Sequence, residues 1–178
     1  MQLPDTPKAM HRSSDAANIL PYGALTVDYT LRNMKIEDYD AVKKLWLTIK
    51  GFAIRSIDDS DEGVERFLER NPKTSVVAEY KGRIIGAILC GHDGRRGTLY
   101  HVCVHEDFRR RGIGRAMVVY CINALEAEKI SNVTLIAFTN NDIGNAFWNE
   151  IGWRRRQDLN NYDLVLNREN RISIVEEK

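Results

Sequence analysis

The feature that most constrains the fold is an arginine- and glycine-rich segment between two apolar stretches. It follows a β-rich run at residues 98–105 and reads Arg109-Arg110-Arg111-Gly112-Ile113-Gly114. After it, residues 112–129 carry apolar side chains at helical spacing. A strand that passes through a short loop directly into a long helix is the start of a parallel crossover. We therefore expect a mixed α/β fold with helices on the faces of the sheet.

Phosphate groups suit the start of this helix for a physical reason. The first turn of a helix presents N–H groups that have no partner within the helix, at the positive end of its dipole. Gly112 and Gly114 bring no side chain that would keep a phosphate away from these groups. The arginines of the segment and Arg115 add attraction, so the segment predicts a diphosphate site. A solvated basic loop is the alternative, and neither a Walker A sequence nor a GxGxxG fingerprint is present.

Apolar periodicity and turn residues predict the remaining elements. Helices are expected at residues 36–49, from a cap at Asp58, Asp59 or Ser60 to Asn71-Pro72, and from residues 140–142 to Ile151. Strands are expected at residues 27–32, 75–80, 83–91 and 133–138, with one or two closing strands between Trp153 and Asn167. The strands at 75–80 and 83–91 are close enough to form an antiparallel hairpin. This order predicts a mixed sheet.

Length and composition fit one soluble globular domain. The chain of 178 residues is long enough for one continuous core, and we assign the domain to residues 27–168, with an extension at 1–26 and a tail at 169–178. The 26 basic and 25 acidic residues leave no overall field that would attract nucleic acid or an anionic membrane. The sequence shows no apolar span of about 18 residues and no secretory signal, which favours the cytoplasm.

Metal binding and nucleic-acid binding find little support in the sequence. The cysteines at positions 90, 103 and 121 lie in apolar runs, without CxxC spacing or the histidine partners of a zinc site. We expect buried thiols and no metal. The basic clusters at 95–96, 109–111 and 154–156 lack interleaved aromatic residues and a recognised nucleic-acid motif, so nucleic-acid binding is a minor alternative.

Two separated motifs resemble those of the GNAT N-acetyltransferase superfamily. The acetyl-CoA motif of that family is Gln/Arg-x-x-Gly-x-Gly/Ala, to which Arg109 to Gly114 correspond in full. Residues 104–109 resemble its Val-x-Pro-x-x-Arg run, with Glu106 in place of the common proline. The second signature, Asn…Leu-Tyr…Leu-Gly-Phe, is similar at the same spacing to Asn141, Phe147-Trp148 and Ile151-Gly152-Trp153. The resemblance covers about residues 28–167.

The resemblance implies a GNAT-like fold, with a central mixed sheet of about six or seven strands and about four flanking helices. It also implies direct transfer of an acetyl group from acetyl-CoA to a primary amine of a small molecule, a peptide N-terminus or a protein lysine. In this family the N–H of Val102 would stabilise the oxyanion, and the backbone of Val104 and the side chain of Asn141 would hold the pantetheine amides. Helix capping is an equal alternative for Asn141. A homodimer is common in the family.

Trp148 is the main departure from the family pattern. It stands where the family usually has a tyrosine that is credited with protonating the leaving thiolate. An indole N–H has no useful acidity near neutral pH, so the proton must come from water or from another residue. Alternatively, the chain is an acyl-CoA-binding sensor or regulatory module that turns over poorly. Core packing is also a sufficient reason for a tryptophan at this position.

No single base for the amine stands out in the sequence. Tyr100 and Glu79 are candidates, although a half-buried aromatic and an exposed strand carboxylate are the simpler explanations of these two residues. Because side chains alternate along a strand, we expect His101 to point away from the face shared by Thr98, Tyr100, Val102 and Val104.

The acceptor-binding region implied by the resemblance is the connection between the first two helices, residues 50–61. The acidic run at residues 58–62 could attract a cationic amine, but capping of the second helix explains the same residues.

Overall fold

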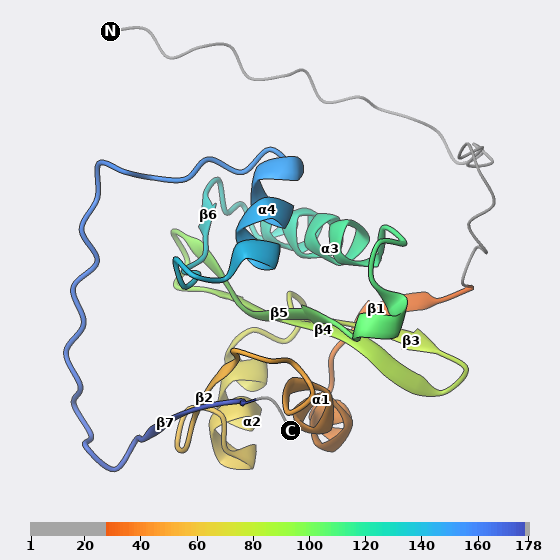
Figure 1. Ribbon diagram of the computed structural model, residues 1–178, viewed down its shortest axis with the longest axis horizontal. Helices are drawn as coiled ribbons and strands as arrows, with labels where there is room; N and C mark the ends of the chain where they lie inside the picture. Colours follow the sequence, from red (N-terminus) through yellow and green to blue (C-terminus); the bar gives the residue numbers. More distant parts are fainter. Residues whose placement is uncertain (1–27, 177–178) are drawn as a thin grey trace, which may run out of the picture.

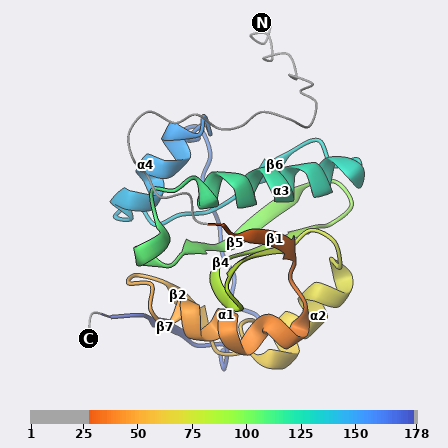
Figure 2. The same ribbon diagram turned by 90° about the vertical axis from the view of Figure 1, so that its right-hand side faces the viewer.

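The computed structural model describes residues 28–176, which form three layers (Figure 1). A five-stranded mixed sheet lies in the middle. Helices α3 (Ile113–Ala127) and α4 (Asp142–Glu150) cover one face, and α1 (Tyr39–Trp46), α2 (Asp61–Arg70) and a two-stranded sheet cover the other. The view in Figure 2 shows the same order of layers. The predicted mixed α/β class is confirmed.

The central sheet has the strand order β1-β3-β4-β5-β6. Its antiparallel neighbours are β1 (Thr30–Asn33), β3 (Val76–Tyr80), β4 (Arg83–His92) and β5 (Gly97–Val104), and β6 (Val133–Thr134) runs parallel to β5. The parallel pair is the product of the β5–α3–β6 crossover that the sequence predicts. The central sheet has five strands instead of the expected six or seven, because the chain after α4 adds no strand to it.

Of the two helices on the lower face, α2 is close to its predicted bounds and α1 is shorter than predicted. Ser60 begins α2, because its Oγ accepts a hydrogen bond from the N–H of Gly63 at 3.0 Å. The first helix is shorter than the expected 36–49: residues 36–38 form a 3-10 turn and α1 ends at Trp46. Its buried residues lie at helical spacing and face the sheet: Tyr39, Val42, Leu45 and Trp46.

Each face of the sheet has its own apolar core. On the α1 and α2 side, Trp46, Val42 and Val64 are fully buried against the sheet. On the α3 side, the buried helix residues are Ile113, Met117, Val118, Cys121 and Leu125. Among residues 28–176, no helix has both the length and the apolar character needed to cross a membrane.

The three cysteines are free and buried, as predicted. Cys103 lies in the core on the α1 side, and Cys90 and Cys121 lie together in the core on the α3 side. Burial raises the pKa of Cys103 to about 12, so this thiol stays protonated at neutral pH. Within the part of the chain that the structure describes, no three His, Cys, Asp or Glu side chains gather in a way that could hold a metal ion.

The chain after α4 departs most from prediction. Residues 153–167 form no strand, and residues 154–169 run exposed from the layer of α4 to the opposite layer (Figure 1). The strand expected at 133–138 is also short, because β6 ends at Thr134. A closing hairpin would have to pair with this edge, which offers only a two-residue ladder. The closing strands expected between Trp153 and Asn167 therefore have no neighbour with which to form a sheet.

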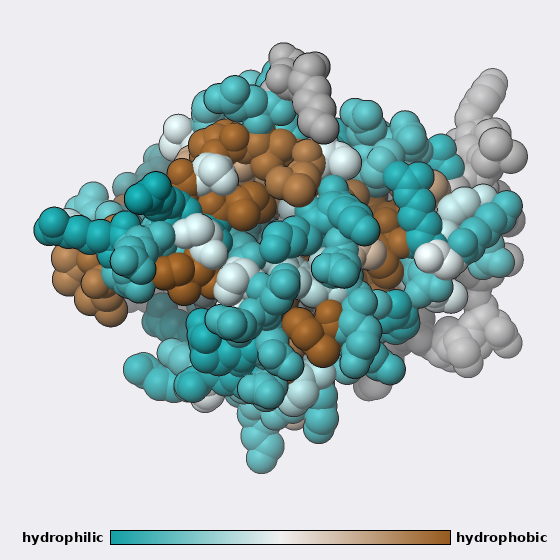
Figure 3. Space-filling view, turned by 90° about the horizontal axis from the view of Figure 1, so that it is seen from below, coloured by the Kyte–Doolittle hydropathy of each residue, from teal (hydrophilic) through white to brown (hydrophobic). Residues whose placement is uncertain are grey.

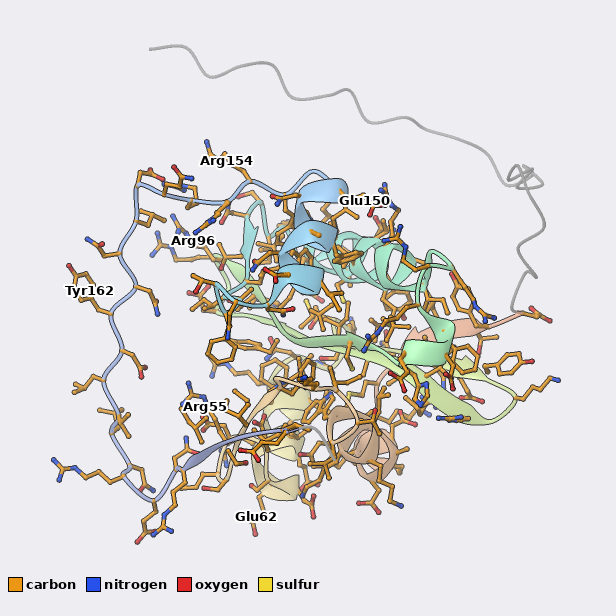
Figure 4. The ribbon with its side chains drawn as sticks, viewed as in Figure 1. Arg55, Glu62, Arg96, Glu150, Arg154 and Tyr162 are labelled. Atoms are coloured by element: carbon orange, nitrogen blue, oxygen red, sulfur yellow. The ribbon has the colours of Figure 1, made fainter. Side chains whose placement is uncertain are left out.

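The apolar side chains of this extended segment stay in solvent. Tyr162 is 87% exposed and points away from the body of the molecule (Figure 4), and Leu166 is 92% exposed. Seen from below in Figure 3, the segment contributes an apolar patch at the left edge of a mostly hydrophilic surface. Monomeric soluble proteins rarely expose large apolar side chains together in this way.

The chain then returns to the lower layer, where β7 (Ile172–Ile174) pairs antiparallel with β2 (Ala53–Arg55). Around this ladder, the side chain of Ser56 donates to the carbonyl of Glu169 and accepts from the N–H of Arg171, both at 2.9 Å. The side chain of Asn170 accepts from Ile57 N–H at 2.9 Å and donates to Asp58 at 2.8 Å. We call residues 169–175 the C-terminal clasp, because they hold the connection between α1 and α2.

Candidate active site

The turn from β5 into α3 contains two left-handed residues. Arg110 has a φ of 61° and Gly112 a φ of 77°. Glycine adopts this conformation without strain, whereas a side chain at positive φ costs about 1 kcal/mol or more. A Cβ atom at Gly112 would meet no heavy atom within 4 Å, so the space beside it is open. The turn thus exposes backbone, rather than side chain, in front of the helix.

The N-terminus of α3 has no side-chain cap, because its N-cap residue is Gly112. The corresponding positions of α2 and α4 are Ser60 and Asn141, and both cap their helices. The N–H groups of Ile113 and Gly114 are therefore left for water or an anion. This is the geometry that the predicted diphosphate site requires.

The arginines of the segment do different things. The Nε of Arg109 donates to the carbonyl of Val104 at 3.0 Å, which ties the loop back to the end of β5. The guanidinium of Arg111 lies over the ring of Phe108 at 5.6 Å. Arg110 and Arg115 are exposed to solvent. Two of the arginines thus brace the loop, and their charge remains beside the helix start.

One edge of β5 is open beside this loop. Within the described residues, β5 and β6 pair only at Gly97–Val133 and Thr98–Thr134, so residues 99–104 have no strand partner on that side. Unpaired peptide groups along such an edge can bind an extended ligand. A Cβ at Gly114 would lie 3.4 Å from Phe147 of α4 and 3.8 Å from Val104. The edge of β5, the start of α3 and helix α4 therefore meet at one place.

A β-bulge interrupts the pairing of β4 and β5. Leu89 pairs with Tyr100 and Ala87 with Cys103, which leaves one extra residue on β5. His101 lies in this bulge with a φ of 49°, in the left-handed region. Bulges bend a strand and redirect its side chains, and they are common beside active sites.

The bulge overturns the predicted alternation along β5. Tyr100 packs edge-on against Phe67 of α2, with ring centroids 5.9 Å apart. His101 lies on the same side, stacked on Trp46 of α1 at 4.3 Å. Val102 packs in the core on the α3 side. The expectation that Tyr100 shares a face with Val102 is wrong, because the left-handed residue between them shifts the alternation by one position.

The two predicted base candidates lie apart. Tyr100 is 48% exposed and pairs with Leu89, whereas Glu79 pairs with Ile84 near the other end of β4. Glu79 Oε2 accepts from Arg32 Nε at 3.1 Å and from Arg32 Nη2 at 3.0 Å. The same guanidinium lowers the pKa of Asp38, which it contacts at 2.7 Å. Glu79 thus belongs to an ion-pair network that joins β1, β3 and the start of α1.

Trp148 and Asn141 both have structural partners. The ring of Trp148 packs between those of Phe147 and Trp153, each with a centroid 4.9 Å away. Asn141 Oδ1 accepts from the N–H of Gly144 at 2.9 Å, which is the capping role that the sequence left as an alternative. The predicted roles of both side chains toward coenzyme A stay predictions.

A histidine–carboxylate pair that no sequence motif indicates lies beneath the bulge. His101 Nε2 lies 2.7 Å from Asp59 Oδ1, and the side chains are 17% and 5% exposed. The other carboxylate oxygen of Asp59 accepts from the N–H of Arg55 at 2.7 Å. The acidic run suggested a cap, but Ser60 is the cap and Asp59 turns inward instead. No local pattern connects positions 59 and 101, so only the fold reveals this pair.

Comparisons with known proteins agree with this geometry. The family model described as Acetyltransferase (GNAT) family matches residues 39–153. An acetyltransferase of Pectobacterium atrosepticum is 34% identical over 112 residues, which are 63% of this chain and 78% of that protein. An acetyltransferase of Yersinia enterocolitica is 29% identical over 136 residues, covering 76% of this chain and 91% of the relative.

A solved structure shows the same fold. The PaiA N-acetyltransferase from Thermoplasma acidophilum, in complex with coenzyme A, superposes with a TM-score of 0.64 at 13% identity, over 82% of this chain and 96% of that one. At this identity the likeness speaks for the fold alone. The family model, however, spans more than half of the sequence and includes the uncapped start of α3, the open edge of β5 and helix α4. The chain belongs to the GNAT family of acetyltransferases and is an N-acetyltransferase.

Proposed function

We propose that the chain transfers an acetyl group from acetyl-CoA directly to a primary amine of a small molecule, a peptide N-terminus or a protein lysine. The observation that carries this proposal is the uncapped N-terminus of α3 behind a left-handed Gly112, next to the open edge of β5. This site offers unpaired N–H groups to a diphosphate and an unpaired strand edge to an extended amide chain. Acetyl-CoA contains both.

The residues at the bulge support the acyl-transfer step. Val102 lies in the bulge next to His101, and its N–H is the donor that we assign to the oxyanion. A fixed backbone donor of this kind contributes roughly 3 kcal/mol to the transition state, because it needs no reorganisation. The carbonyl of Val104 is already bound to Arg109, so we assign its N–H rather than its carbonyl to the donor substrate. The side chain of Asn141 retains its NH₂ group for a pantetheine carbonyl while its oxygen caps α4.

The acceptor amine approaches from the layer of α1 and α2 in this proposal. The acidic run before α2 gives it little charge attraction, because its members have other partners or point away. Asp58 accepts from Asn170 at 2.8 Å, and Asp61 lies 3.5 Å from Lys43. Figure 4 shows Glu62 at the outer end of α2, pointing away from the sheet, and Arg55 beside β7. A homodimer and a cytoplasmic location stay predictions.

Thiol release tests the proposed function. Purified protein is incubated with acetyl-CoA and a panel of polyamines, aminoglycosides, peptides with free N-termini and lysine-containing peptides, and coenzyme A is measured with a thiol reagent. We expect at least one amine class to accelerate release well above the rate without amine, and mass spectrometry to find the acetylated amine. Binding of acetyl-CoA without acceleration by any amine refutes the proposal.

The alternative of an acyl-CoA sensor depends on the presence of Trp148 in place of a tyrosine. The packing of Trp148 against neighbouring aromatic rings explains this tryptophan without a change of function. The exchange Trp148→Tyr decides between them. A transferase that draws its proton from elsewhere turns over well in both forms, with kcat changed by less than about tenfold. A sensor descended from an enzyme shows turnover only after a tyrosine is restored. The melting temperature reports whether the smaller ring disturbs the packing against Trp153.

A further inference from the structure

The conformation of His101 is costly and specific. A non-glycine residue at a φ of 49° is strained by about 1 kcal/mol or more, and such strain persists only where the surroundings enforce it. The bulge between β4 and β5 places the side chain beneath the sheet, where it packs on Trp46 at 4.3 Å and on Phe52 at 5.6 Å between ring centroids. The fold thus aims this imidazole at the layer of α1 and α2.

Asp59 is built to orient this imidazole. One carboxylate oxygen contacts His101 Nε2 at 2.7 Å, and the other accepts from the N–H of Arg55 at 2.7 Å. The hydroxyl of Tyr39 donates to the backbone carbonyl of Asp59, and burial together with the charge of Asp59 raises the pKa of this tyrosine, so it remains a donor. With Nε2–H given to the carboxylate, the lone pair of the ring is on Nδ1.

His101 Nδ1 is open to a ligand. The histidine makes no hydrogen bond through this atom to residues 28–176, and its side chain is 17% exposed. Among those residues, the only fully buried side-chain nitrogen or oxygen without a partner is Trp46 Nε1. Nδ1 is therefore reached by solvent, as a base that accepts a proton from a substrate or a water must be.

The position of the pair in the fold matches a proton acceptor. His101 directly precedes Val102 in the chain, and we assign the N–H of Val102 to the oxyanion. The proton acceptor and the oxyanion donor therefore belong to one bulge. The start of α3, where we place the phosphates, lies in the opposite layer (Figure 1). An amine that enters from the side of α1 and α2 would thus meet Nδ1 before it reaches the thioester.

We propose that His101, oriented by Asp59, is the general base that accepts the proton of the acceptor amine, directly or through one water. This inference rests on the proposed function. An ammonium substrate loses one proton to Nδ1, and the neutral amine attacks the thioester carbonyl to form the C–N bond and the oxyanion, whose collapse breaks the C–S bond. The nitrogen loses a second proton on collapse to the amide. One of the two protons ends on the coenzyme A thiol and the other in solvent, so His101 is neutral again.

The variant His101→Asn tests the base. Asparagine tolerates the left-handed conformation, so the backbone of the bulge should survive, although the shorter side chain loses the hydrogen bond that Nε2 makes with Asp59. We expect kcat/KM for the amine to fall about 100-fold or more, while KM for acetyl-CoA stays unchanged. The loss of activity should become smaller as the pH approaches the pKa of the free amine, which is about 10.4 for lysine. At that pH, solvent alone provides neutral amine.

Two further variants separate chemistry from structure. The matched control is His92→Asn, because the Nδ1 of His92 accepts from the N–H of Gly94 at 3.1 Å and an asparagine oxygen can do the same. It should leave the pH profile unchanged. Asp59→Asn keeps the acceptor for Arg55 but removes the charge beside the imidazole. It should lower kcat, because an amide NH₂ facing Nε2 cannot accept the ring proton there and the lone pair is no longer held on Nδ1.

The outcomes distinguish a failure of the proposed base from a failure of the proposed acetyl transfer. If no amine accelerates coenzyme A release by the wild-type protein, the proposed function and the base both fail. If the wild type turns over and His101→Asn matches it, only the base is refuted. A loss of activity by the same factor at every pH, together with a lower melting temperature, also overturns the base, because it marks a packing role.

Discussion

Gly112 and Arg110 share a left-handed backbone but should respond oppositely to substitution. Gly112→Val introduces strain of about 1–3 kcal/mol and places a branched side chain in the open space before α3. Each N–H bond to phosphate lost in this way costs about tenfold in affinity. Arg110→Gly relieves strain and removes one charge, so it should change coenzyme A affinity little. Calorimetric titration with coenzyme A measures both.

Gly94 provides the matched control for this comparison. It has a φ of 88° and no heavy atom within 4 Å of a Cβ, and it lies in the β4–β5 turn, at the opposite end of β5 from Gly112. Gly94→Val should therefore lower the melting temperature as Gly112→Val does, yet leave coenzyme A binding intact. Equal losses of affinity for the valine variant at Gly112 and the glycine variant at Arg110 would contradict the primary role of the backbone.

Among the elements, the C-terminal clasp has a testable function. It holds the connection between α1 and α2, which supplies Phe52 and Asp59 to the imidazole of His101. Deletion of residues 169–178 removes the β2–β7 ladder and the contacts of Ser56. We expect a higher KM for the amine and a lower kcat, with an unchanged dissociation constant for coenzyme A, because the clasp lies in the layer of α1 and α2 and α3 lies on the opposite face of the sheet (Figure 1).

A point variant makes the same test without shortening the chain. The N–H of Val175 donates to the carbonyl of Phe52 at 2.9 Å, and Val175→Pro removes this donor. It should reproduce part of the kinetic effect of the deletion. If amine kinetics are normal in both variants, the connection between α1 and α2 keeps its shape without the clasp.

On the scale of the whole molecule, the extended segment after α4 is the longest exposed stretch among residues 28–176. Residues 154–169 are exposed, and they include arginines at positions 154, 155, 156 and 168. Limited trypsin digestion should cut here first, and mass spectrometry of the early fragments identifies the sites. Resistance to trypsin would show that the segment is covered in solution. Resistance that appears only at high protein concentration would identify the cover as a second copy of the chain.

The parts of the fold that the sequence predicts correctly depend mostly on residues that are close together in the chain. The hairpin of β3 and β4, the long helix α3 and the caps at Ser60 and Asn141 depend on residues close in sequence. The closing strands expected between Trp153 and Asn167 are absent, because the residues of a segment show only that it could form a strand. Pairing also needs a neighbour, and β6 ends at Thr134.

The candidate site divides in the same way. The turn that we propose for the phosphates is contiguous, so its glycines and arginines predict an uncapped helix start directly from the sequence. The pair of His101 and Asp59 could not, because a single left-handed residue reverses the alternation of β5 and joins two positions that are distant in sequence. Strain at His101 is the feature that a rule based on regular strands cannot foresee.

The bulge in β5 also has a consequence for the order in which the two substrates bind and react. If the donor lies along the open edge by α3 and the acceptor enters beneath the sheet, the two reactants reach the same strand by separate entrances. Neither has to leave before the other can enter, and no acetylated protein intermediate is needed. Double-reciprocal plots should then intersect rather than run parallel, and a dead-end analogue of one substrate should not compete with the other.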